Sequence, residues 1–113
     1  VKSYADHTAL KTLPKVDLKV SARSRTESGE QVAHITLENP SRSLAFMVRL
    51  RITKGAGGEE VLPAIWQDNY FPLMPGEKRE ITATYQPRLL QGATPVAEVS
   101  GWNVHTKSQP VRR

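Results

Sequence analysis

Apolar and polar residues alternate along several short segments of the chain. In the first segment Val16, Leu18, Val20 and Ala22 would face one way and the residues between them the other. This period of two is typical of a β-strand with one buried face, so each such segment predicts one strand. The same spacing recurs in three further segments, whose inward residues are Ala33, Ile35 and Leu37, then Phe46, Val48, Leu50 and Ile52, then Ile81, Ala83 and Tyr85.

Turn-forming residues separate these segments. The polar stretch 25–30 contains Gly29 and predicts a hairpin loop, and the glycine-rich stretch 54–60 predicts a surface loop. Asn39-Pro40-Ser41 ends the second strand, because proline cannot donate to a ladder and restricts the residue before it. Pro75-Gly76 predicts a turn, since proline presets φ and glycine accepts a positive φ.

The two ends of the chain lack sustained alternation. Residues 1–14 predict a connector that leads into the domain, and residues 107–113 predict a basic tail that is frayed. The last strand is expected over residues 96–104, with a bulge at Gly101-Trp102 where the alternation breaks. The domain itself is therefore predicted to span residues 15–106.

The pattern predicts six or seven short strands and no helix within 113 residues. Such strands are stable when two antiparallel sheets pack face to face. We therefore expect an all-β fold, an immunoglobulin-like antiparallel β-sandwich of about seven strands, which typically takes about 100 residues. The chain has no cysteine, so the disulfide of antibody domains is excluded and the likeness concerns the architecture alone.

A polar corner lies between two strand-forming segments and has aromatic residues on both sides. Asp68 and Asn69 can close a turn through hydrogen bonds from side chain to backbone, which would hold Trp66, Tyr70 and Phe71 together. These five residues are candidates for contact with carbohydrate or with another domain, because aromatic faces stack on sugar rings. The interpretation we favour is that the rings fill the core or pack against a neighbouring domain, with Trp66 and Tyr70 the most exposed.

The chain carries no pattern of catalytic or metal-binding residues. It has no glycine-rich phosphate loop and no serine nucleophile motif, and its three histidines have no partner at metal-ligand spacing. A glycosidase needs two carboxylates that face each other across a cleft, whereas Glu59, Glu60, Glu77 and Glu80 fall beside loops and turns. We therefore predict no catalytic residue, no metal and no cofactor in this chain.

The net charge of +5 comes from 16 lysine and arginine residues that are dispersed along the chain. Nucleic-acid binding needs a basic stripe or cluster, so a solvated surface of mixed charge is the favoured interpretation. No apolar run approaches the length of a membrane span. We expect neither a nucleic acid nor a membrane as a partner.

Six short motifs follow one another along residues 16–104: Leu37-Glu38-Asn39-Pro40-Ser41, Leu44-Ala45-Phe46-Met47-Val48-Arg49-Leu50, Leu62-Pro63, Asp68-Asn69-Tyr70-Phe71, Leu73-Met74-Pro75-Gly76-Glu77 and Gly101-Trp102-Asn103-Val104. In order and spacing they resemble the C-terminal immunoglobulin-like domain of glycoside hydrolase family 2 enzymes. The most similar branch holds the exo-β-D-glucosaminidases, the β-mannosidases and the mannosylglycoprotein endo-β-mannosidases. Gln67 and Pro72 depart from the pattern of that branch.

The resemblance implies a multidomain parent enzyme that hydrolyses β-linked glucosaminides or mannosides in a central (β/α)8 barrel. The catalytic glutamates of that family lie in the barrel, so none can be assigned to a residue here. The implied role is a non-catalytic accessory domain that packs on and stabilises the barrel, with other domains of the same chain as its partners. The compartment stays open, and a secreted or periplasmic parent is one option.

Two other functions remain open. An independent carbohydrate-binding module would use Trp66 and Tyr70 to bind a polysaccharide or an oligosaccharide. A protein-interaction domain of immunoglobulin type would use its sheet faces, where Arg49 and Arg51 would contribute.

Overall fold

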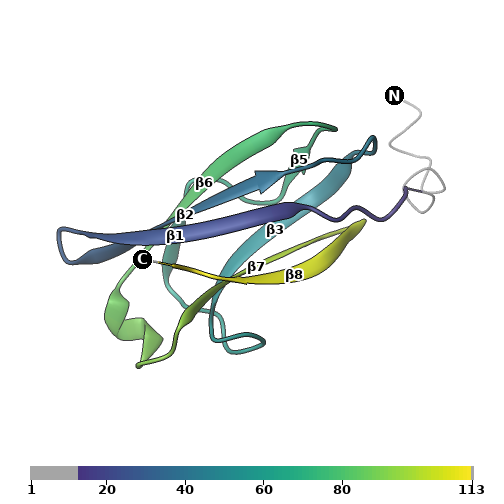
Figure 1. Cartoon of the computed structure of the whole chain (residues 1–113). Helices are drawn as coiled ribbons and strands as arrows, with labels where there is room; N and C mark the ends of the chain where they lie inside the picture. The colour runs from purple at the N-terminus through teal and green to yellow at the C-terminus, as the bar shows by residue number, and fades with distance from the viewer. Residues whose placement is uncertain (1–12, 113) are drawn as a thin grey trace.

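The computed structural model describes residues 13–112, which form two facing β-sheets and one short 3₁₀ helix (Figure 1). The predicted connector, residues 1–14, lies almost wholly outside the described residues. The elements are β1 (Lys19–Glu27), β2 (Glu30–Glu38), β3 (Ala45–Lys54), β4 (Ala64–Trp66), β5 (Phe71–Leu73), β6 (Lys78–Tyr85), η1 (Pro87–Leu90), β7 (Pro95–Gly101) and β8 (Val104–Pro110).

The strands pair in two four-stranded sheets. The first has the order β1-β2-β6-β4 and the second the order β5-β3-β7-β8. All neighbouring strands within the sheets are antiparallel. This is the arrangement of an immunoglobulin-like sandwich, so the predicted fold class is confirmed. The described residues hold eight strands, more than the six or seven predicted, because the chain after Gly101 forms the further strand β8.

The core lies between the sheets and is formed by the residues that the alternation placed inward. From the first sheet Ile35 and Ala83 are fully buried, and from the second Leu50 and Ile52 are 1% and 0% exposed. Burying apolar surface of this kind is the main favourable term in folding. Leu89 and Leu90 of η1 pack against the core from one end. None of the described residues forms a helix that is long and apolar enough to cross a membrane.

Strand β3 departs from simple alternation at its start. Ala45 pairs with Leu73 and Val48 pairs with Phe71, with a register shift between the two pairs. Met47 takes a positive φ of 56° at this bulge, so Ala45 and Val48 both point inward although they are three residues apart. Phe46, predicted to be inward, is therefore only half-buried, and that part of the prediction is wrong.

The first hairpin is tighter than predicted. Strand β1 runs to Glu27 and β2 begins at Glu30, so Ser28 and Gly29 alone make the turn. Their φ angles are 52° and 80°, as a type I′ turn requires at both central positions. The expected loop over residues 25–30 is thus mostly strand.

The C-terminal segment is a strand, and the prediction of a frayed tail from Lys107 is wrong. Lys107 pairs with Val99 in the ladder between β7 and β8, and Val111 is only 5% exposed. The predicted single strand over 96–104 is also wrong, because β7 ends at Gly101 and the chain turns back. A side chain at Gly101 would place Cβ 2.8 Å from Cγ2 of Val104, so the turn needs glycine.

A buried asparagine fixes this turn. The Asn103 side chain donates from Nδ2 to the carbonyl oxygens of Pro14 and Leu44, at 2.9 and 2.7 Å. Its Oδ1 accepts a hydrogen bond from the backbone N–H of Phe46 at 2.8 Å. Asn103 is 2% exposed, so water cannot replace these bonds. One amide therefore joins the entry of the domain, the start of β3 and the turn into β8.

We expect Asn103→Ala to lower the free energy of unfolding by about 3 kcal/mol, because three backbone groups lose their bonds to the buried amide. Urea unfolding followed by circular dichroism measures this. His105→Ala, at an exposed residue two positions away, is the matched control and should change stability by less than about 0.5 kcal/mol. Equal losses in the two variants would contradict the role of the amide.

Candidate interaction site at the β4–β5 corner

Residues 67–70 carry the chain from β4 in the first sheet to β5 in the second. The first-sheet side of this corner is held to β6, where the backbone N–H of Gln67 donates to the carbonyl oxygen of Thr82 at 2.9 Å. The Gln67 side chain also bonds to Thr82, because its Oε1 accepts a longer hydrogen bond of 3.3 Å from the backbone N–H of Thr82. Gln67 therefore extends the ladder of β4 by one residue.

The second-sheet side of the corner is held by Asn69. Its Oδ1 accepts from the backbone N–H of Leu50 at 2.8 Å, and its Nδ2 donates to the carbonyl oxygen of Leu50 at 2.9 Å. Leu50 lies beyond the two residue pairs that β5 makes with β3. The amide thus replaces a strand partner at the edge of β3, which an aspartate lacking the donor could not do.

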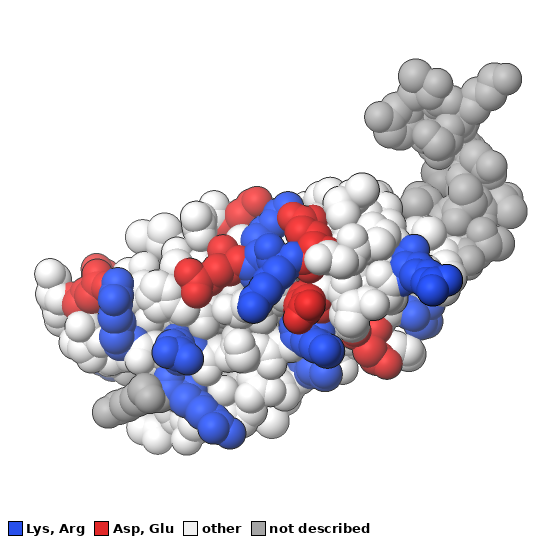
Figure 2. Space-filling model, turned by 45° about the horizontal axis from the view of Figure 1, so that its top comes forward, with Lys and Arg blue, Asp and Glu red and all other residues white. Residues whose placement is uncertain are grey.

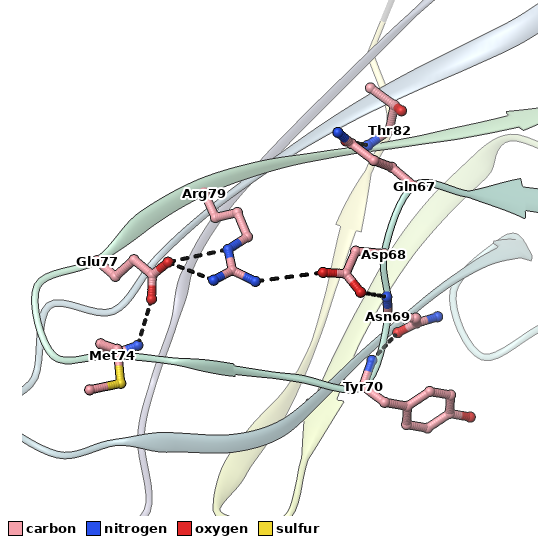
Figure 3. Close-up of polar contacts among 8 residues, drawn as sticks. All are labelled: Gln67, Asp68, Asn69, Tyr70, Met74, Glu77, Arg79 and Thr82. Atoms are coloured by element: carbon pink, nitrogen blue, oxygen red, sulfur yellow. Dashed lines mark hydrogen bonds and ion pairs between the residues drawn. The ribbon is translucent and has the colours of Figure 1, made fainter.

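The predicted side chain to backbone hydrogen bonds at the corner are present. Asp68 Oδ1 accepts from the backbone N–H of Asn69 at 2.8 Å, and Asn69 Oδ1 accepts from that of Tyr70 at 3.0 Å (Figure 3). Tyr70 takes a positive φ of 55° in this turn. The corner is therefore a fixed element of the fold.

Arg79 connects the corner to the turn at Pro75-Gly76. Its Nη1 lies 3.8 Å from Asp68 Oδ2, and its Nη2 and Nε lie 2.7 and 3.2 Å from Glu77 Oε2 (Figure 3). The guanidinium carbon lies 4.6 Å from the centroid of the Phe71 ring. A planar cation that covers a ring and binds carboxylates at its edge is a geometry that suits arginine and not lysine.

The second oxygen of Glu77 closes the Pro75-Gly76 turn. Glu77 Oε1 accepts from the backbone N–H of Met74 at 2.8 Å, and Gly76 has the positive φ of 74° that was predicted there. The Met74 N–H, followed by the Arg79 guanidinium, lowers the pKa of Glu77 from its ordinary value of 4.5. Ionised Glu77 is thus part of the folded structure.

The three aromatic residues of the candidate site have separate environments. Phe71 is 4% exposed and belongs to the core, while Trp66 is half-buried and packs against it. Tyr70 is 56% exposed, and the guanidinium of Arg49 lies 5.9 Å from the centroid of its ring. The aromatic residues therefore do not form one exposed platform, and among them Tyr70 alone is exposed.

Apolar residues on both sides of the corner are exposed. Leu62 and Ile65 are 64% and 72% exposed, and Met74 is 56% exposed. Ile65 lies on β4, an edge strand of the first sheet. Exposed apolar residues of this size mark interaction surfaces when they are contiguous.

The arginines on the outer face of β3 already have partners within the chain. Arg49 Nη2 lies 3.6 Å from Glu60 Oε1, and Arg51 Nε donates to Glu98 Oε1. The hydrogen bond to Glu98 raises the pKa of Arg51. Figure 2 shows acidic side chains interleaved with basic ones over one face of the molecule. This agrees with the surface of mixed charge predicted from the sequence.

The described residues contain no group of three or more histidine, aspartate or glutamate side chains that could hold a metal ion. Sequence reasoning missed Arg79 and Leu50 as members of the corner. The position of Arg79 could have been inferred from the sequence, because it lies two residues before Ile81 and therefore on the same, core-facing side of β6. The role of Leu50 could not have been inferred, because Leu50 contacts Asn69 through its backbone and not through its side chain.

Comparison with known proteins identifies relatives for nearly the whole chain. The family model described as "Exo-beta-D-glucosaminidase Ig-fold domain" matches residues 1–104. An exo-β-D-glucosaminidase of Arthroderma benhamiae is 38% identical over 95% of this chain, and one of Amycolatopsis orientalis is 35% identical over 96%. The crystal structure of the exo-chitosanase CsxA of Amycolatopsis orientalis superposes on 94% of the chain with a TM-score of 0.86 and 36% identity.

The matched region is a small part of each relative. The chain spans 11% of the length of the two curated relatives and 13% of the chain in the crystal structure. The remaining length of those proteins has no counterpart here.

The pH dependence of stability tests whether ionised Glu77 stabilises the folded state. Because folding lowers the pKa of Glu77, its stabilisation is complete above the ordinary value of 4.5 and is lost as the pH falls through the lowered value. We expect Glu77→Gln to be less stable than the wild type at pH 7, with the difference in the free energy of unfolding shrinking as the pH falls below 4.5 and on through the lowered pKa.

Urea unfolding of both proteins at several pH values measures that difference. Glu59→Gln is the control, because Glu59 is an exposed glutamate on the glycine-rich loop. A difference between wild type and Glu77→Gln that stays constant from neutral to acidic pH would contradict the assignment.

Proposed function

The chain belongs to the exo-β-D-glucosaminidase Ig-fold domain family, and from this we propose that it is a non-catalytic accessory domain of a multidomain glycoside hydrolase. The parent would act on β-linked glucosaminides, as the names of the relatives indicate, and would belong to glycoside hydrolase family 2. The domain would pack on the catalytic barrel and stabilise it. The β-mannosidase part of the resemblance stays a prediction.

The observation that carries the proposal is the proportion of the match. Some 95% of this chain corresponds to only 11% of an exo-β-D-glucosaminidase, so the chemistry of such an enzyme has ample room elsewhere. The candidate site supports the same conclusion. Asp68 and Glu77 both contact Arg79 and backbone N–H groups, which is the environment of carboxylates that hold a turn.

The surface for packing is proposed to be the edge at β4, with Leu62 and Ile65 as the main contacts and with Tyr70 and Met74 as further exposed apolar residues before and after β5. These residues are the larger part of the exposed apolar residues among residues 13–112. Interfaces between domains of one chain have mixed composition, and an apolar centre with a polar rim is typical of them. The polar rim here would be Asp68 and Gln67.

Serine substitutions at Leu62 and Ile65 separate packing between domains from stability of the domain itself. In the 113-residue chain both side chains are exposed, so the double variant Leu62→Ser, Ile65→Ser should unfold at nearly the wild-type temperature. In the full-length parent the same change should cost about 3 kcal/mol and lower the unfolding temperature, because two apolar side chains lose their contact.

Calorimetry of both proteins makes the comparison, with Lys19→Ser on β1 as an exposed control. An unchanged parent would exclude packing through this edge. An equal loss in both proteins would mean that the two residues stabilise the domain alone.

The alternative of an independent carbohydrate-binding module has one favourable observation, the exposed ring of Tyr70. We expect no saturable binding, because Trp66 packs on the core and Arg49 lies near the Tyr70 ring. Titration of the 113-residue chain with chitosan and mannan oligosaccharides, followed by calorimetry, tests this. Saturable heat that is lost in Tyr70→Ala and kept in Trp102→Ala would instead assign the chain to this second function.

A further inference from the structure

Two arginines, one on a strand of the first sheet and one just after a strand of the second, lie side by side at the edge opposite β4. Arg23 belongs to β1, and Arg112 follows β8. The backbone N–H of Arg112 donates to Ala22 at 3.1 Å, and its carbonyl oxygen accepts from Ser24 at 2.6 Å. Figure 1 shows this end of the chain alongside β1. These bonds form a parallel bridge, in which the paired residues Arg23 and Arg112 point to the same side.

Neither residue of this arginine pair has an acidic partner among residues 13–112. Four other arginines of the strands do have one, in the pairs Arg25–Glu27, Arg49–Glu60, Arg51–Glu98 and Arg79–Glu77. Like charges directly opposite each other on neighbouring strands are destabilising. The arginine pair is therefore a place where an external negative charge would be favourable.

The arginine pair lines a hollow of about 1030 Å³ on the outer side of β1 and β2. Hydroxyl and amide groups of Ser21, Thr36 and Gln109 line it as well. Three arginines and one carboxylate, that of Glu80, contribute charge to the hollow. His34 of β2 also lines the hollow and pairs with Arg23 in the ladder between β1 and β2. Its Nδ1 lies 3.7 Å from Oε1 of Glu80.

We propose that this hollow is a binding site for a small oxyanion with two or more negative charges, such as phosphate or a polycarboxylate. The guanidinium groups of Arg23 and Arg112 would donate to its oxygens, since the planar fork of arginine matches both phosphate and carboxylate. Ser21, Thr36 and Gln109 offer further donors at the rim. The bound anion also removes the repulsion within the arginine pair. The site does not depend on the function proposed above.

Thermal unfolding of the 113-residue chain tests the site in low-salt buffer. Sodium phosphate and sodium citrate should each raise the unfolding temperature above that in sodium chloride of equal ionic strength, because a ligand that binds the folded state stabilises it. The two anions separate a tetrahedral ligand from a carboxylate ligand. If neither exceeds chloride, the proposal is overturned.

The variant Arg112→Gln should weaken anion binding by about tenfold, the effect of losing one charge-assisted contact. It should fold like the wild type, because no hydrogen bond or ion pair holds its side chain in the described residues. Arg88→Gln, at an exposed arginine on η1, is the matched control and should bind as the wild type does.

Backbone amide resonances locate the ligand independently of stability. Phosphate should shift the amides of residues 21–25 and 112 in the wild type, and the shifts should be lost in both Arg23→Gln and Arg112→Gln. Shifts that survive in both variants, or that arise equally with chloride, would overturn the site.

Discussion

Backbone groups that lose their strand partner must find another one, and in this sandwich three asparagine amides supply it. Asn69 binds both polar groups of Leu50 where β5 no longer covers β3. Asn103 binds the chain entry and the start of β3. Asn39, fully buried, donates to the carbonyl oxygens of Ser43 and Leu73 at 2.8 and 3.1 Å. Each amide stands where a ladder ends, and an aspartate or a leucine there would leave buried groups unbonded.

Strands with a continuous buried face could be predicted from the sequence, since Ile35 and Ile81 follow a strict period of two. The prediction of strands failed where a bulge interrupts the period of two, or where backbone hydrogen bonds and not buried side chains hold the strand. Phe46 lies beside a bulge that has no sequence signal of its own. Strand β8 buries Val104 but almost none of the residues after it, so its place depends on ladder bonds that no hydrophobic pattern reports.

The same limit applies to the candidate site. Asp68 and Asn69 were recognisable as a turn because their side chains bond locally. The contact from Asn69 to Leu50 spans 19 residues, and the one from Arg79 to Asp68 joins β6 to the corner, so both depend on the assembled sandwich. An aromatic cluster was expected where the chain in fact divides its rings between the core and the surface. Sequence proximity in a corner between two sheets therefore says little about which rings share a face.

The two sides of the sandwich differ in how their strand edges are closed. On one side β1 and β8 cover each other, with bridges at Val16–Val104 and Arg23–Arg112. On the other side the outermost strands are β4 and β5, each three residues long, and β5 carries Pro72 at its centre. A second molecule that tried to add a strand would find few free backbone groups there, and at Pro72 no N–H at all. The sheet ends thus resist the edge-to-edge association that leads β-proteins to aggregate.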